Sequence, residues 1–180
     1  MALRKFVGKP RKSALPNGPP GSAGDTEAEV ELTVHKDFAA PHVALKVGTA
    51  DAVKLLVVPG LVAEKEPNNG FATAQAVTVP LALHGTIEKP RDVDVYRFTG
   101  RKGERLRIQI TARNLGSLLD ATVTLYDENR RIVESCDDVG GDTDPSFPVV
   151  LPRDGVYYLS VIDSHDLGGP GFAYLLSVTK

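Results

Sequence analysis

Residues 105–112 read RLRIQITA, and this stretch decides the fold class. Leu106, Ile108 and Ile110 alternate with polar neighbours. Side chains of a β-strand point alternately to its two faces, so a period of two predicts a strand with one buried face. We therefore expect Arg105, Arg107 and Gln109 to face solvent.

Similar runs recur about every ten residues on both sides of this strand, with Gly, Asp and Pro between them. They are VTVPLALHGTI (77–87), DVYRFT (94–99), ATVTLYD (121–127), RIVES (131–135), FPVVLP (147–152), GVYYLSVID (155–163) and FAYLLSVTK (172–180). The only helical candidate is FATAQAV (71–77), of about two turns. This pattern predicts an all-β protein with an antiparallel, jelly-roll-like two-sheet β-sandwich and a small β-rich N-terminal segment.

Composition divides the chain into three regions. Residues 1–26 are rich in Pro, Gly and basic residues, which predicts a disordered tail. Residues 27–61 hold three short alternating runs, too few to bury two faces, so we expect a short β-rich segment. Residues 62–180 form the predicted sandwich. No signal peptide is visible, because basic residues interrupt the only apolar stretch near the N-terminus.

The net charge and the cysteine content limit which partners the protein attracts and which bonds stabilise its fold. The formal net charge of −2 over 180 residues gives no overall attraction to nucleic acid or anionic lipid. No apolar run is long enough to cross a bilayer. With Cys136 as the one cysteine, no intrachain disulfide can form, so the fold depends on its core or on bound ions.

The sequence offers no catalytic residues. Ser164, His165 and Asp166 are consecutive, so they cannot converge as a triad by themselves. The four histidines lack metal-ligand spacing, and no nucleophile-elbow, zinc-protease or P-loop motif occurs. We therefore predict that the protein is not an enzyme.

Two acidic stretches suggest a cation site: EKEPNNG (64–70) and DVD (92–94). In an extended segment, side chains two residues apart point to the same side, roughly 6.5–7 Å apart. Glu64 and Glu66 stand in this relation, as do Asp92 and Asp94. Without a cation these carboxylates would repel one another, and a divalent ion such as calcium would resolve this repulsion. The alternative is a solvated turn, because Pro-Asn-Asn-Gly is good turn chemistry unaided.

The order of these motifs resembles the bacterial pre-peptidase C-terminal domain over residues 64–180. The residues that carry the resemblance are EKEPNN, GTIEKPRDVDVYRF, KGERLRIQI, GSLLDATVTLYDENRRIV, LPRDGVYYLSVID and YLLSV. The collagen-binding domains of clostridial collagenases are similar to it. The preceding stretch, 48–69, resembles a junction of planctomycete-type multidomain proteins, which implies that residues 27–61 are a remnant of an immunoglobulin-like domain.

The resemblance implies a non-catalytic accessory or binding module of a secreted or cell-surface protein, with an extracellular protein or polysaccharide as partner. It also implies a calcium site where the linker meets the sandwich. Its ligands would be Glu64, Glu66, Asn68, Asn69 and Asp94. Two departures lower the charge of this site: Asn69 stands where relatives often have an acid, and Asp92 is displaced by one from the acidic position that Arg91 occupies.

Two other interpretations remain at this point. One is a carbohydrate- or protein-binding adhesion module with no metal role, and the other is a fragment of a peptidase-associated enzyme. The sequence does not predict the ligand or the oligomeric state.

Overall fold

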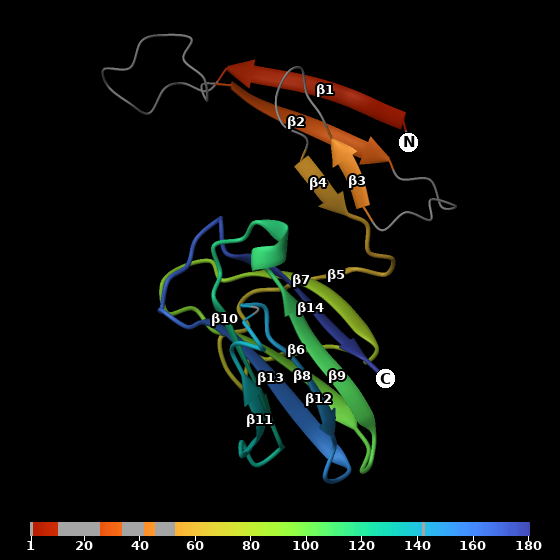
Figure 1. Ribbon diagram of the computed structural model, residues 1–180, viewed down its shortest axis with the longest axis vertical. Coiled ribbons are helices and arrows are strands. Elements are labelled where there is room, and N and C mark those ends of the chain that lie inside the picture. The colour runs from red at the N-terminus through yellow and green to blue at the C-terminus, as the bar shows by residue number, and fades with distance from the viewer. Residues whose placement is uncertain (1, 11–25, 34–41, 46–52, 142) are drawn as a thin grey trace. The chain divides into compact units, whose positions relative to one another are not determined.

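A computed structural model describes residues 2–10, 26–33, 42–45, 53–141 and 143–180 (Figure 1). The chain divides into two compact units, Met1–Val43 and Ala44–Lys180. Within the described residues, no helix is long and apolar enough to cross a bilayer.

The first unit contains a strand at residues 2–10, where the composition predicts a disordered tail. Strand β1 (Ala2–Pro10) pairs antiparallel with β2 (Thr26–Thr33), with one register irregularity between Leu3 and Lys5. The prediction for residues 1–26 rested on composition, whereas the backbone of residues 2–10 finds its hydrogen-bond partners in β2. Residues 11–25 lie outside the described part of the chain.

The strands expected within residues 27–61 are present. They are β2, β3 (His42–Leu45) and β4 (Val53–Leu56), of which β3 and β4 form a two-stranded sheet. Their origin as a remnant of an immunoglobulin-like domain stays a prediction.

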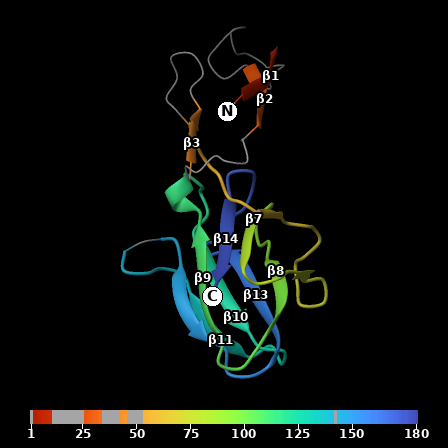
Figure 2. The same ribbon diagram turned by 90° about the vertical axis from the view of Figure 1, so that its right-hand side faces the viewer.

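Two five-stranded sheets form the predicted sandwich, which confirms the fold class (Figures 1 and 2). The first sheet has the order β11 (Ile132–Cys136), β10 (Ala121–Tyr126), β13 (Gly155–Asp163), β8 (Asp94–Gly100) and β6 (Gln75–Ala76). The second has the order β12 (Ser146–Val150), β9 (Arg105–Thr111), β14 (Ala173–Thr179), β7 (Leu81–Thr86) and β5 (Val62–Ala63).

The sheets are mixed rather than purely antiparallel. The two-residue edge strands β5 and β6 run parallel to β7 and β8, while the other described pairs of the sandwich are antiparallel. The one helical candidate, residues 71–77, does not form a helix: a turn at residues 71–73 leads into β6. The free edge of β8 supplies backbone partners there, and two turns of isolated helix are too short to compete.

The core confirms the alternation read from the sequence. In β9, Leu106, Ile108 and Ile110 are buried, and the polar residues between them are exposed. Inward side chains of both sheets form one apolar cluster. Among its largest fully buried members are Leu83, Tyr96, Ile108, Ile110, Leu125, Tyr157, Leu159, Tyr174 and Leu176. Removal of this apolar surface from water is the main stabilising term of the sandwich.

Asp144, an acidic residue in the loop before β12, is buried and stabilises the start of a short helix. The short 3-10 helix η1 (Arg113–Leu115) follows β9, and the buried Asp144 carboxylate accepts hydrogen bonds from the backbone N–H groups of Ala112, Arg113 and Asn114 at 2.8–3.1 Å. Asp144 therefore caps the start of η1 rather than serving as a solvated surface charge.

Gly85 gives the first test of this packing. It lies opposite Tyr174 in the β7–β14 ladder, and an added Cβ would stand 2.5 Å from both Cζ and Oη of that tyrosine. Gly85→Ala should therefore lower the free energy of unfolding by about 1–3 kcal/mol, the usual cost of overpacking. The measurement is urea unfolding followed by circular dichroism.

Gly70→Ala is the matched control. A Cβ on Gly70 would meet no heavy atom within 4 Å, so its effect should stay within about 0.5 kcal/mol. Equal effects of the two substitutions would contradict the close packing of Tyr174 against β7.

Candidate metal centre

The linker between β5 and β6 crosses from the edge of one sheet to the edge of the other. It begins as a continuation of β5, with Glu64 N donating to His84 O at 3.0 Å. The Gln75 side chain holds the linker, accepting from Lys65 N at 2.7 Å and donating to Ala63 O at 3.0 Å. Farther along, Asn68 O accepts from Val95 N at 3.0 Å. The linker is thus hydrogen-bonded to both sheets.

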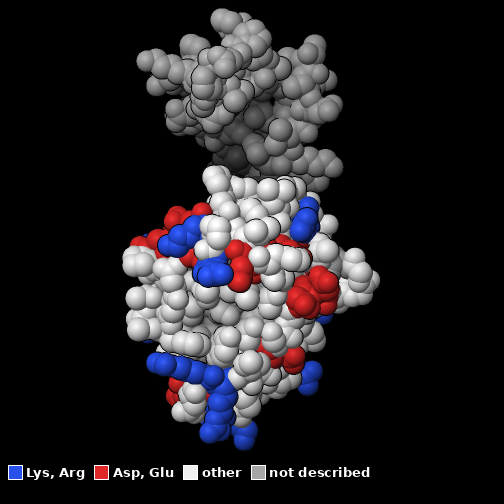
Figure 3. Space-filling view, turned by 90° about the vertical axis from the view of Figure 1, so that its left-hand side faces the viewer, with Lys and Arg blue, Asp and Glu red and all other residues white. Residues whose placement is uncertain are grey.

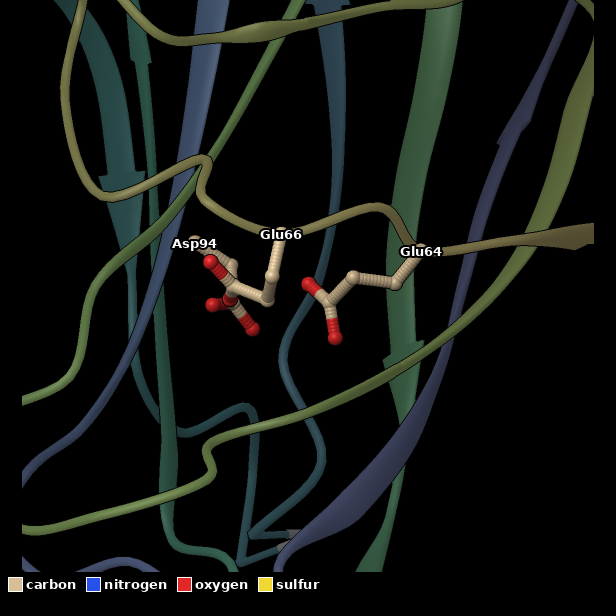
Figure 4. Close-up of side chains that lie close together, drawn as sticks. All are labelled: Glu64, Glu66 and Asp94. Carbon is tan, nitrogen blue, oxygen red and sulfur yellow. The ribbon is translucent and has the colours of Figure 1, made fainter.

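Three carboxylates meet where the linker passes the start of β8. Glu64, Glu66 and Asp94 each offer one oxygen, and these oxygens all lie within 4.8 Å of one another. Figure 4 shows the two linker carboxylates turned toward Asp94, which begins β8. Asp94 is buried, Glu64 is half-buried and Glu66 is exposed, so the cluster extends from the interior to the surface.

Glu64 is the linker side chain that is tied most firmly to the sandwich. Its Oε2 accepts from Thr86 N on β7 at 2.8 Å. Its Oε1 accepts from the Tyr96 hydroxyl on β8 at 2.5 Å and from Asn68 Nδ2 at 2.8 Å. One carboxylate therefore connects the linker to both sheets.

A pair of buried tyrosines underlies the cluster. Tyr96 comes from β8 and Tyr174 from β14, so the pair joins the two sheets, and the hydroxyl oxygens are 2.6 Å apart. The Tyr174 hydroxyl is also 2.6 Å from Asp94 Oδ2. The contacts run in order from Glu64 through Tyr96 and Tyr174 to Asp94.

This chain of contacts bears on the protonation of the Asp94 carboxyl. Three short O···O contacts need three hydrogens, and the two hydroxyls supply two. Burial raises the pKa of the Asp94 carboxyl to about 9, with the Glu64 charge adding to the rise. We therefore expect Asp94 to hold the third proton at neutral pH in the metal-free protein.

The pKa of Glu66 is also raised. The first cause is desolvation, and the charges of Asp92, Glu64 and Glu88 add to it, while the hydrogen bond from Asn68 N opposes it. Negative charge is thus concentrated on this side of the sandwich, where a cation would relieve it.

Two oxygens of the site are buried without a partner. Asn68 and Asp94 have 0% exposure, and among the described residues nothing donates a hydrogen bond to Asn68 Oδ1 or Asp94 Oδ1. An unsatisfied buried polar group costs about 1–3 kcal/mol, so such atoms are rare in folded proteins. Both atoms are acceptors, and a hydrogen-bond donor or a cation would satisfy them.

These residues fit calcium. Calcium takes six to eight oxygen ligands, including carboxylates and neutral amide oxygens, at about 2.3–2.6 Å. Any two ligands of one ion are then at most about 5.2 Å apart, and the three carboxylate oxygens, all within 4.8 Å of one another, meet this limit. Glu64, Glu66, Asn68 and Asp94 supply carboxylate and amide oxygens at one place.

The other two predicted ligands, Asn69 and Asp92, lie beside this group. Asn69 Nδ2 donates to Asp92 Oδ1, and Asp92 Oδ2 accepts from Glu88 N at 2.8 Å. Both Asp92 oxygens thus accept hydrogen bonds within the protein. A ligand role for Asn69 and Asp92 stays a prediction, whereas the effect of the Asp92 charge on the pKa of Glu66 is direct.

The consecutive Ser164 and His165 have different partners. Ser164 Oγ lies 2.7 Å from Thr122 Oγ1, and His165 Nδ1 lies 3.3 Å from Asp120 Oδ2. Both side chains therefore contact residues at the start of β10, and the absence of a catalytic triad stays a prediction.

Comparison with known proteins identifies the sandwich. Residues 92–162 match the model of one family, the bacterial pre-peptidase C-terminal domain. Residues 92–162 of the sandwich are therefore similar to a pre-peptidase C-terminal domain. The prediction of this family is confirmed, and domains of this kind are accessory modules. The planctomycete-type context and the calcium ligands stay predictions.

One curated relative is a probable subtilase-type serine protease of Deinococcus radiodurans. It is 34% identical over 99 residues, which cover 53% of this chain and 14% of the relative. The matched region therefore spans a small part of that protease.

Two solved structures are similar to the sandwich. The pre-peptidase C-terminal domain of a Bacillus anthracis collagenase is 19% identical, with 59% of this chain and 94% of that chain covered and a TM-score of 0.45. The periplasmic inhibitor of g-type lysozyme from Aeromonas hydrophila is 18% identical, with 58% and 95% covered and a TM-score of 0.40.

The proton on Asp94 predicts how stability depends on pH in the metal-free protein. A folded-state pKa raised to about 9 means that the native state binds a proton that the unfolded state has lost. This contribution is complete below the ordinary pKa of about 4 and is lost as pH rises toward 9. The free energy of unfolding in chelator should therefore fall between pH 5 and pH 9.

Asp94→Asn is the informative variant, because its amide can supply the hydrogen without titrating. In chelator it should show a flatter dependence of the melting temperature on pH than the parent protein. The same slope in both proteins would exclude Asp94 as the proton carrier.

Proposed function

We propose that the sandwich is a non-catalytic accessory module of an exported or cell-surface protein, and that calcium fastens its linker to the sandwich. The observation that carries this proposal is the pair of buried, unpartnered oxygens, Asn68 Oδ1 and Asp94 Oδ1, beside two further carboxylates. The accessory role is supported by the family to which residues 92–162 match.

Glu64, Glu66, Asn68 and Asp94 would hold the ion. Bound calcium would supply the positive charge that offsets the clustered carboxylates and lowers the pKa of Asp94. The residues of the chain do the rest: Tyr96 and Tyr174 orient the Glu64 and Asp94 carboxylates, and Glu64 bonds to Thr86 N. The site thereby joins the linker, β7 and β8 as one unit.

An exported setting is part of the same proposal. Its support is the family assignment, together with relatives whose names describe a subtilase-type protease and a collagenase. The module would then serve a peptidase or a surface protein and bind an extracellular protein or polysaccharide.

The test is thermal unfolding in calcium and in chelator. A ligand that binds only the folded state stabilises it by about 2.7 kcal/mol at a hundredfold excess over Kd, which is a rise of several degrees for a domain of this size. Glu66→Gln and Asp94→Asn should remove most of this rise, and magnesium should produce less of it.

Glu134→Gln on β11 is the control, since Glu134 is exposed on a strand at the far edge of the first sheet. It should respond to calcium as the parent does. Asp94→Asn is preferred to Asp94→Ala, because alanine would remove one of the partners of the buried Tyr174 hydroxyl and destabilise the metal-free protein as well. A calcium response that all three variants share would contradict the proposal.

The alternative, a metal-independent adhesion module, is favoured by one observation. Phe71 stands edge-on to Tyr126 and Tyr158, with ring centroids 5.2 and 5.1 Å apart, and Arg130 lies 5.2 Å from the Phe71 ring. These rings are half-exposed on the outer face of the first sheet. Aromatic rings of this kind bind sugars and proteins.

A pull-down in chelator separates the two functions. If the alternative holds, the parent should bind an insoluble polysaccharide or fibrous protein without calcium, and Tyr158→Ser should lose that binding. Binding that appears only with calcium would instead support the metal-dependent module.

A further inference from the structure

The charge of the sandwich is unevenly distributed. Three connections, 101–105, 127–131 and 153–154, carry six Lys and Arg residues against four Asp and Glu residues, although the chain has a net charge of −2. They join β8 to β9, β10 to β11 and β12 to β13. We call their cationic residues the basic end: Arg101, Lys102, Arg105, Arg130, Arg131 and Arg153.

Contacts between the three connections gather them at one end of the sandwich. Gly103 N donates to Leu151 O at 2.8 Å, and Lys102 N donates to Asp154 Oδ1 at 2.7 Å. Arg153 bridges to Asp127 at 3.0 Å. Figure 1 shows these turns together at the lower end of the second unit, and Figure 3 shows Lys and Arg side chains clustered there on one face.

The acidic residues of these connections are largely used inside the protein. Asp127 is buried, and its oxygens bind Arg153 and the backbone N–H groups of Asn129 and Arg131, which lowers the pKa of its carboxyl. Glu104 pairs with Lys180 at 2.7 Å. These contacts fix the turns. Glu128 and Asp154 are exposed, so five exposed cations stand against two exposed acids.

Five cations of the basic end remain exposed. In the part of the chain that the structure describes, no ion pair is formed by these five residues, which are Arg101, Lys102, Arg105, Arg130 and Arg131. A polar hollow of about 430 Å³, lined by Val79, Thr99, Arg101, Glu104 and Lys180, opens beside them. Like charges held this close attract anions from solution.

From this arrangement we propose that the basic end binds a flexible anionic polysaccharide that carries sulfate or phosphate esters. Four of the five exposed cations are arginines, whose planar forks match the oxygens of such esters. The exposed cations lie on two separate turns, so one small ion cannot reach them all, whereas a chain with repeated charges can.

This inference does not rest on the metal site, so the experiment is run in chelator. The probes are fluorescent dextran sulfate, dextran phosphate and neutral dextran of equal length, titrated with the protein by anisotropy at 50–300 mM NaCl. Binding to either charged polymer, with an affinity that falls steeply as salt rises, is expected because bound cations release counterions. Neutral dextran should not bind.

A matched pair of triple variants locates the surface. Arg101→Gln, Lys102→Gln and Arg131→Gln together remove three cations of the basic end. Lys65→Gln, Lys89→Gln and Arg91→Gln together remove the same charge from exposed residues elsewhere on the sandwich. At 50 mM NaCl the first variant should lose about tenfold in affinity or more, with a smaller salt slope, and the second should lose about twofold at most.

Each other outcome overturns the proposal. Equal losses in the two variants would show that net charge, not the basic end, governs binding. Failure of the parent to bind either charged dextran at 50 mM NaCl would show that the basic end does not bind anionic polysaccharides. Tighter binding to a 20-base-pair DNA duplex than to the charged dextrans would assign the basic end to nucleic acid. Circular dichroism confirms that both variants are folded.

Discussion

Asn68 Oδ1 and Asp94 Oδ1 are acceptors enclosed by protein, and the rest of the junction depends on how they are satisfied. A buried carboxyl has two ways to avoid an unpaired charge: it keeps a proton, or it binds a cation. The raised pKa of Asp94 describes the first state. The second state would use the same oxygens with calcium, so metal binding and loss of the Asp94 proton would be coupled.

The junction also explains how one edge of each sheet of the sandwich is covered. A sheet edge exposes unpaired backbone groups, and proteins cover such edges to avoid aggregation. Here β5 and β6, two residues each, cover β7 and β8, and the linker passes from one to the other. Glu64 and the Tyr96–Tyr174 pair connect this cover to the interior. A metal at this place would therefore stabilise the edge cover and the core together.

Local patterns predicted most of the fold, because alternation in runs such as β9 follows directly from which face is buried. The parallel edge strands were not predictable in this way. A two-residue strand has no period, and β6 exists because β8 offers a free edge, which overrides the weak helical pattern at residues 71–77. The strand β1 was missed for a related reason, since its partner β2 follows a long Pro- and Gly-rich stretch.

The site was predictable only in part. The i, i+2 spacing of Glu64 and Glu66 indicated a shared side, and the structure adds Asp94 to them. Spacing alone could not separate Asp94 from Asp92, because both are buried and they differ in their hydrogen bonds. The oxygens of Asp92 accept N–H groups, whereas Asp94 Oδ1 has no partner among the described residues. Tyr96 lies two residues after Asp94 on the same strand face, which was the available signal. Tyr174 is 80 residues away from Asp94 in the sequence, so no sequence signal linked it to the site.

The structure of crystals grown in millimolar calcium tests most directly the central claim that calcium binds between the linker and the sandwich. The account predicts one ion at about 2.3–2.6 Å from Asn68 Oδ1 and Asp94 Oδ1, with Glu64 and Glu66 completing part of its ligand set. The contradicting result is a protein saturated with calcium in which Asn68 Oδ1 and Asp94 Oδ1 accept hydrogen bonds from protein or ordered water and no ion lies between them.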